Sequence, residues 1–226
     1  MNNLKSYDIQ LLCLLYKYSV YIEAHTGFRS NMGTVDNICV LHGIISHTLY
    51  EGKRLYCAFI DFTKAFDYVV RYTLWMKLIK LGIRGNILNI IKSMYCAVKS
   101  RVKLENKLSD AFERESLSPF LVFMFLNDIE DVCMNKGLSG IDVNFFKLVL
   151  ILYADDIVVF AESKDELQRS LDALLEYCNR WKLVVNTRKT KIMIFKKSGR
   201  LPNNIDFNFD NVEIEIVKHY LFRYSI

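Results

Sequence analysis

Acidic residues interrupt two strongly apolar segments of the chain. Asp61 lies near the end of Leu55–Phe62, and the pair Asp155-Asp156 stands between LVLILY and IVVFA. Burying an unpaired carboxylate in such a setting is costly. Each acid is therefore expected at a solvent-open turn or beside a cation.

The two acidic positions could form one site if their segments are neighbouring strands. Three carboxylates would then meet at the strand ends, and their mutual repulsion would raise their pKa values unless a divalent cation held them. Oxygen ligands with no nearby His or Cys favour magnesium or manganese over zinc. Exposed turns and a shared metal site are both open interpretations of the acids alone.

The hydrophobic pattern predicts the elements that must position these acids. Leu55–Phe62 is too short for a helix and is typical of a buried strand. Phe145–Ala161 has two apolar arms around the acids, which predicts a hairpin. A capping box at Ser163–Glu166 opens an amphipathic helix over 164–181. Two short strands, Leu183–Asn186 and Lys191–Phe195, are expected after it.

The rest of the chain is predicted to be mostly helical. Helices are expected at 4–22, 33–50, 71–81, 86–96 and 119–134. One further strand, Val98–Leu104, has cations on one side at Lys99, Arg101 and Lys103. These cations fit an ordinary solvated face or a contact with nucleic-acid phosphates. Together the elements predict an α+β fold.

The composition is that of a packed globular chain. The 226 residues are 52% hydrophobic and 24% charged, with 2 prolines and a net charge of +5, so disorder and collagen are excluded. The 6 cysteines form no C-x-x-C pair, which argues against a zinc ribbon and favours a reducing compartment. The apolar runs are too short to cross a bilayer. We therefore expect an intracellular protein, cytoplasmic or nuclear and not secreted, with no membrane association and no obvious protein partner.

Five ordered sequence blocks resemble the reverse transcriptase domain of non-LTR, LINE-type retrotransposons. Two of them are AFIDFTKAFD at Ala58–Asp67 and YADD at Tyr153–Asp156. The other three are Gly27-Phe28-Arg29 with Asp36-Asn37-Ile38, Leu117-Ser118-Pro119 with Asn127-Asp128, and Asn186 with Lys189-Thr190-Lys191. The resemblance implies a right-hand polymerase palm, an antiparallel sheet backed by helices. Residues 1–54 would be partial fingers and residues 55–226 the palm, with the thumb missing.

The resemblance also implies the roles of individual residues. Asp61 and Asp155, assisted by Asp156, would hold two Mg²⁺ or Mn²⁺ ions for nucleotidyl transfer, and Lys189 would lie near the departing pyrophosphate, although Lys191 is close to it. Phe62 and Phe66 would contact the incoming nucleotide, with the Phe66 ring excluding a ribose 2′-hydroxyl. The substrates would be an RNA template, a DNA primer and deoxynucleoside triphosphates. On charge alone, nucleic-acid contacts are expected at Arg29, Lys99, Arg101 and Lys103.

The sequence departs from the family pattern ahead of Leu117-Ser118-Pro119. Where the family usually has Gly-x-x-Gln-Gly, this chain has Phe112-Glu113-Arg114-Glu115. Carboxylates there would repel template and nucleotide phosphates. Two expectations follow: a weakly active or inactive truncated polymerase palm, or a non-enzymatic remnant that binds only nucleic acid or metal. An unrelated α+β binding module would require Asp61 and Asp155 to be far apart.

Overall fold

The computed structural model describes the chain in twelve ranges. These are residues 34–63, 70–96, 99–100, 103–104, 107–108, 112–113, 119–136, 138, 140–143, 146–153, 156–198 and 205–218. The predicted helix at 4–22 lies outside them.

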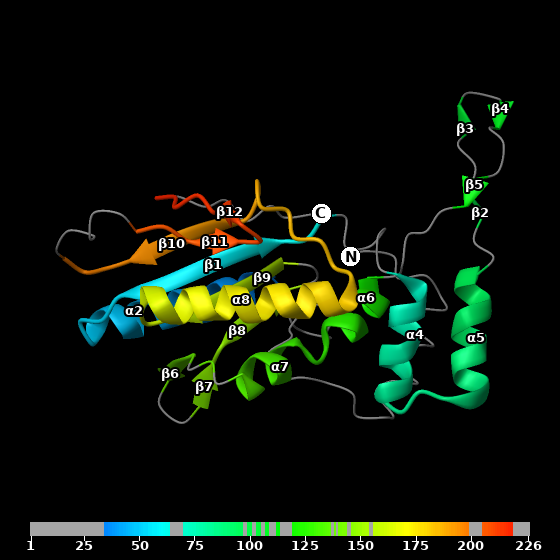
Figure 1. Ribbon diagram of the computed structural model, residues 1–226, viewed down its shortest axis with the longest axis horizontal. Coiled ribbons are helices and arrows are strands. Elements are labelled where there is room, and N and C mark those ends of the chain that lie inside the picture. Colours follow the sequence, from blue (N-terminus) through cyan, green and yellow to red (C-terminus); the bar gives the residue numbers. More distant parts are fainter. Residues whose placement is uncertain are drawn as a thin grey trace.

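A four-stranded antiparallel sheet forms the centre of the fold (Figure 1). Its strands run in the order β10 (Lys191–Phe195), β1 (Leu55–Asp61), β9 (Asp156–Ala161) and β8 (Leu150–Tyr153). β1 is buried along its length, so it reads as the continuous apolar run expected of a central strand. The predicted strand at 55–62, the pairing of the hairpin arms and the strand at 191–195 are confirmed.

Helices cover both faces of this sheet. On one face α8 (Lys164–Trp181) packs with α4 (Arg71–Lys80), α5 (Gly85–Cys96), α6 (Pro119–Leu126) and α7 (Ile129–Asn135) in the larger core. On the other face α2 (Thr34–Tyr50) packs through Ile44 against Leu55 and Cys57. Alternate residues of β1 thus serve two cores, as the side-chain period of a strand requires. Among the helices that the structure describes, none is long and apolar enough to cross a bilayer.

The sequence determines where α8 begins and ends. The Ser163 side chain accepts a hydrogen bond from the Glu166 N–H, and the Glu166 carboxylate accepts one from the Glu162 N–H, which satisfies donors at the helix start. Lys182 ends the helix with a left-handed φ of 60°. The predicted helix at 164–181 is confirmed, and so are those at 33–50, 71–81 and 86–96 within a residue or two.

Three predicted elements differ from the structure. The helix expected at 119–134 is two helices, α6 and α7, separated at Asn127–Asp128. The strand expected at 183–186 is one isolated bridge between Val185 and Phe62. The strand expected at 98–104 is described only as two two-residue strands, β2 (Lys99–Ser100) and β3 (Lys103–Leu104).

Several short pairs complete the described fold. β2 pairs with β5 (Phe112–Glu113), and β3 pairs with β4 (Lys107–Leu108), on an arm that projects away from the sheet in Figure 1. β6 (Ile141–Val143) pairs with β7 (Phe146–Leu148), and β11 (Asn208–Phe209) pairs with β12 (Val212–Glu213). The predicted boundary at 54/55 falls between α2 and β1. The assignment of residues 1–54 to fingers stays a prediction.

Candidate active site

Two acidic residues face each other where adjacent strands begin and end. Asp61 is the last residue of β1 and Asp156 the first of β9, and the antiparallel register makes them direct partners. Side chains at such opposed positions share a face, with Cβ atoms roughly 4.5–5.5 Å apart. The structure therefore brings together two of the three predicted acids. The third, Asp155, lies outside the described residues.

The chain that follows α8 fixes the end of β1 through the backbone of Asp61. The Asp61 N–H donates to the Thr190 hydroxyl at 3.3 Å. The Asp61 carbonyl accepts from the Asn186 N–H at 2.7 Å. Asp61 thus has both backbone groups bonded to one segment, which restricts where its carboxylate can lie.

The same segment presents one lysine to the acid. The Asn186 carbonyl accepts from the Lys189 N–H at 3.1 Å, closing a turn. This turn places Lys189 Nζ 3.6 Å from Asp61 Oδ2. Lys191 Nζ is instead 2.8 Å from the Glu215 carboxylate. Of the two lysines, Lys189 is therefore the one beside the acids.

One carboxylate oxygen in this site lacks a hydrogen-bond donor. Asp61 Oδ2 is buried without such a partner, and its 3.6 Å separation from Lys189 exceeds hydrogen-bonding distance. A buried anionic oxygen is costly unless a cation binds it. With Asp156 opposite, the donor set suits a hard divalent cation. Within the described residues no group of three His, Cys, Asp or Glu side chains is close enough to hold a metal, and Asp155 is outside that search.

The remaining predicted site residues are distributed differently. The sequence led us to expect that Phe62 contacts the incoming nucleotide, but Phe62 is only 3% exposed and belongs to the larger core, where its ring supports the end of β1. Lys99 and Lys103 lie on β2 and β3, and the strand register places Lys99 opposite Glu113 of β5. Phe66, Arg29 and Arg101 are outside the described residues.

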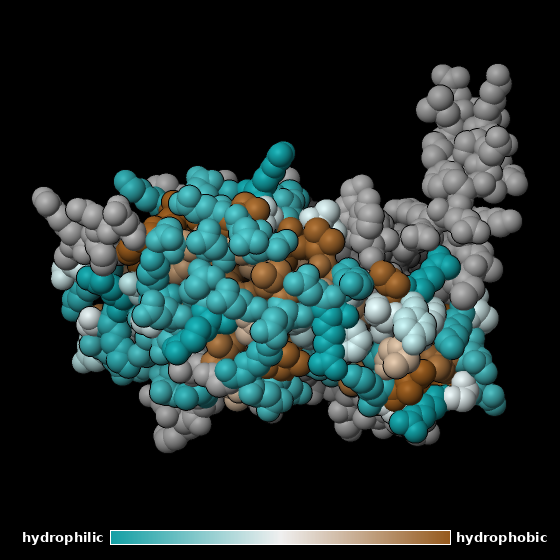
Figure 2. Space-filling model, in the orientation of Figure 1, coloured by the Kyte–Doolittle hydropathy of each residue, from teal (hydrophilic) through white to brown (hydrophobic). Residues whose placement is uncertain are grey.

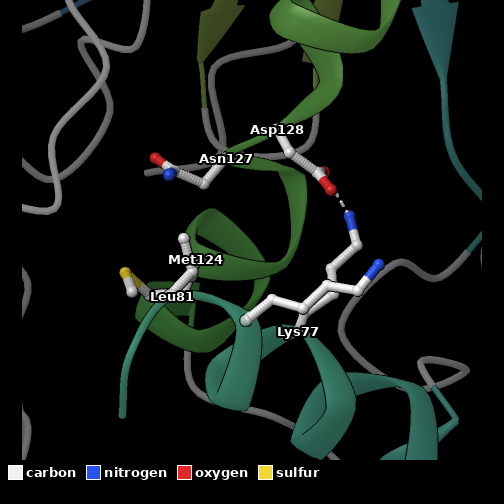
Figure 3. Close-up of a pocket in the computed structure, with 6 residues that line it drawn as sticks. Lys77, Leu81, Met124, Asn127 and Asp128 are labelled. Carbon is white, nitrogen blue, oxygen red and sulfur yellow. Dashed lines mark hydrogen bonds and ion pairs between the residues drawn. The ribbon is translucent and has the colours of Figure 1, made fainter.

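A second charged site, which the sequence analysis missed, lies among the helices. Lys77 of α4 is 2% exposed, and its ammonium donates to the Phe125 carbonyl, the Tyr177 hydroxyl and Asp128 Oδ1. Figure 3 shows it reaching from α4 to the carboxylate after α6. The Tyr177 hydroxyl also donates to Asp128 Oδ1 at 2.6 Å. We call these residues, Lys77, Phe125, Asp128 and Tyr177, the buried lysine cluster.

Aromatic rings enclose the ammonium of this cluster. Lys77 Nζ lies 4.3 Å from the Trp181 ring centroid, 4.5 Å from that of Tyr177 and 4.6 Å from that of Phe125. Burial lowers the pKa of Lys77 to about 8, with Asp128 opposing the shift and Lys80 and Arg180 adding to it. Burial raises the pKa of Tyr177 well above its usual value, and Asp128 adds to that effect. The three acceptors come from α6, the turn after it and α8, so the cluster joins these helices to α4. Because all three ammonium protons have acceptors, Lys77 has no proton left for a ligand.

The sequence held a signal for this cluster. Lys77 lies between Leu74 and Leu81 on one face of α4, at i+3 and i+4 spacings. A lysine within an apolar stripe indicates a buried partner, but its partner Asp128 is 51 residues away, and no local pattern identifies it.

Comparison with known proteins gives one family match along most of the chain. The family described as "Reverse transcriptase (RNA-dependent DNA polymerase)" matches residues 3–213. The chain is 26% identical over 186 residues to the Pol polyprotein of the type-1 retrotransposable element R2 of Bradysia coprophila, covering 80% of this chain and 21% of that protein. It is 28% identical over 190 residues to the RNA-directed DNA polymerase from mobile element jockey of Drosophila funebris, covering 77% and 20%. The chain thus spans about a fifth of the length of these curated relatives.

Solved structures share the fold at low sequence identity. The apo telomerase of Candida tropicalis, truncated from its C-terminal domain, superposes with a TM-score of 0.59 at 15% identity, covering 92% of this chain and 43% of that one. The same organism's telomerase with a fragment of telomeric RNA gives a TM-score of 0.53 at 15% identity, over 83% and 33%. These similarities support the palm-like α+β architecture and show the fold alone.

Proposed function

The chain belongs to the reverse transcriptase family, and on that premise we propose that it carries the nucleotidyl-transfer site of an RNA-directed DNA polymerase. The observation that carries the proposal is the register that sets Asp61 opposite Asp156, with Lys189 beside Asp61. The substrates would be an RNA template, a DNA primer and deoxynucleoside triphosphates.

The acids would act as the metal ligands. Reverse transcriptases generally use divalent metal ions, and we propose that Asp61 and Asp156, with Asp155 next to it in sequence, hold two Mg²⁺ or Mn²⁺ ions. The orphaned Asp61 Oδ2 supports this assignment. When bound, such ions activate the primer 3′-hydroxyl and neutralise charge on the pyrophosphate leaving group.

Lys189 would have two positions in this account. In the structure its ammonium partly balances the Asp61 charge from 3.6 Å. With Asp61 Oδ2 serving as a metal ligand, Lys189, whose side chain is 58% exposed, would be free to approach the anionic triphosphate. Positioning and charge balance by these residues, with no covalent intermediate, would carry the reaction.

Other contacts stay proposals. Phe66 would exclude a ribose 2′-hydroxyl, and Arg29, Lys99, Arg101 and Lys103 would contact nucleic-acid phosphates. A reducing intracellular compartment is supported by free thiols at Cys39, Cys57, Cys133 and Cys178. Burial, the main cause, raises the pKa of Cys133 to about 11 and that of Cys178 to about 12, so both stay protonated and unreactive.

Primer extension tests the proposal. The full chain, Mn²⁺, an RNA template, a labelled DNA primer and deoxynucleoside triphosphates should give weak extension, because Glu113 and Arg114 stand where the family has Gln-Gly. Asp61→Asn should reduce it by on the order of 100-fold or more. Asp206→Asn, which removes an exposed charge paired with Lys164, is the matched control.

Two results would count against this function. Extension that Asp61→Asn leaves intact would show that another site or a contaminant is responsible. Absence of extension, with Mn²⁺ still bound through Asp61, would favour the non-catalytic alternative of a palm that binds only metal or nucleic acid.

A further inference from the structure

Exposed cations gather around one tryptophan at the end of α8. Lys80 Nζ lies 5.0 Å from the Trp181 ring centroid, and the Arg180 guanidinium carbon lies 5.6 Å from it. Both cationic side chains are exposed, whereas Trp181 is buried. We call Lys80 and Arg180 the cation patch.

The cations of the patch differ in their ion pairing from other cations near α8. Among the described residues, neither Lys80 nor Arg180 forms an ion pair. By contrast, Lys136 pairs with Glu176 of α8, and Lys164 of α8 pairs with Asp206. Asp128, the acid of the neighbouring buried lysine cluster, already accepts from Lys77 and Tyr177. Within the part of the chain that the structure describes, no ion pair therefore neutralises the positive charge of the patch.

Like charges crowd this end of the molecule. Lys77 Nζ lies only 4.3 Å from the centroid of the same Trp181 ring, and both Lys80 and Arg180 disfavour the charged form of Lys77. Three cations around one ring repel one another, and an external anion would relieve that repulsion. The ring contacts restrict Lys80 and Arg180, so these two side chains lose less conformational entropy when they bind an anion.

The surface beside the patch is recessed, and its lining includes the apolar side chains Leu81 and Met124 and one carboxylate, Asp128. A cavity of about 240 Å³ lies between α4 and the turn after α6 and shares Lys80 with the patch. It is smaller than the roughly 300–1,000 Å³ of small-molecule pockets, so it suits part of a chain-like ligand better than a separate small molecule. Figure 2 shows hydrophilic side chains over the outward face of α8.

We propose that the cation patch is a second nucleic-acid contact, which binds the phosphate backbone of single-stranded RNA independently of base sequence. The inference rests on the proposed function for its choice of RNA as the polyanion. Fixed cations without base-reading groups position a nucleic acid without selecting its sequence. The patch adds to the predicted contacts at Arg29, Lys99, Arg101 and Lys103 and lies on different elements from them.

Salt-dependent RNA binding tests this proposal. Fluorescence anisotropy with a labelled single-stranded RNA would compare the full wild-type chain with Lys80→Gln/Arg180→Gln between 50 and 200 mM KCl. Each lost phosphate contact should flatten the slope of log K against log salt by about 0.7, so by about 1.4 in the double variant. The loss should be equal for RNAs of different sequence.

The matched control is Lys136→Gln/Lys164→Gln, which makes the same charge change at two cations with carboxylate partners. Its slope should stay close to that of the wild type. Equal slopes for the two double variants, or a wild-type chain that does not bind the RNA, would overturn the proposal. All four substitutions are at partly or fully exposed side chains, and circular dichroism would verify that each variant folds.

The Asp61→Asn variant separates this proposal from the proposed function. It should lose primer extension and keep the wild-type RNA affinity and slope. Loss of RNA binding only at the patch, with no extension by any variant, would contradict the polymerase proposal and leave the cation patch supported.

Discussion

Two lysine–carboxylate pairs of the described structure, Lys77–Asp128 and Lys189–Asp61, differ in the burial of the lysine, in the distance and in hydrogen bonding. Lys77 Nζ is 2.5 Å from Asp128 Oδ1, and the lysine side chain is 3% exposed. Lys189 Nζ is 3.6 Å from Asp61 Oδ2, and that lysine side chain is 58% exposed. Asp128 Oδ1 accepts two hydrogen bonds, whereas Asp61 Oδ2 accepts none.

The difference indicates different tasks for the two pairs. A buried lysine whose three ammonium protons all have acceptors holds helices together and has no proton to offer a ligand. A buried carboxylate oxygen whose exposed counter-ion lies beyond hydrogen-bonding distance can exchange that counter-ion for a metal. Bond satisfaction, more than charge, therefore distinguishes the structural pair from the candidate catalytic one.

The largest expected effect is on stability. Lys77→Met should lower the free energy of unfolding by about 1.5–3 kcal/mol, because the buried Phe125 carbonyl and the Asp128 carboxylate, whose side chain is 34% exposed, would lose their charged donor. The same substitution at the other lysine, Lys189→Met, should cost less than about 1 kcal/mol, because the Lys189 side chain is 58% exposed. Urea unfolding followed by circular dichroism measures both.

Equal losses in the two variants would contradict the contrast between the pairs. If Lys77→Met does not fold, Tyr177→Phe provides a milder variant. It removes the hydroxyl that bonds Asp128 and Lys77 and should cost about 1–3 kcal/mol.

A smaller effect concerns the titration of Lys77. Because burial lowers its pKa to about 8 from 10.5, its side-chain resonance in a lysine-labelled NMR sample should titrate near pH 8. Between pH 8 and 10.5 the unfolded state binds more protons at this residue, so its contribution to stability rises with pH over that interval. A Lys77 resonance that titrates above pH 10 would show that Asp128 outweighs burial.

The sequence was sufficient for the central sheet and for the family. The apolar run around Cys57, the acids after it and the capping box at Ser163 each reflect a local rule, and local rules can be read from one chain. The family recognition from AFIDFTKAFD and YADD is confirmed by the match over residues 3–213. The α+β palm architecture is confirmed as well.

What the sequence could not supply depends on contacts between distant residues. The break between α6 and α7 coincides with Asp128 and its bonds to α4 and α8, and no local signal in an apolar helix marks it. The segment at Val185 has strand-like residues. However, the Val184 carbonyl accepts a hydrogen bond from the Thr63 N–H, and the Asn186 N–H donates to the Asp61 carbonyl. Its backbone groups therefore support the site and do not form a regular strand.

Manganese binding tests the central claim most directly. Electron paramagnetic resonance would measure the concentration of free Mn²⁺ in titrations of the wild type and of two variants, Asp61→Asn and Asp128→Asn. Each variant removes the acid of one lysine pair. Asp61→Asn should weaken binding by at least about 10-fold, while folded Asp128→Asn should bind as the wild type does. Equal binding by the wild type and Asp61→Asn, or equal losses in both variants, would contradict the assignment of the metal site to Asp61.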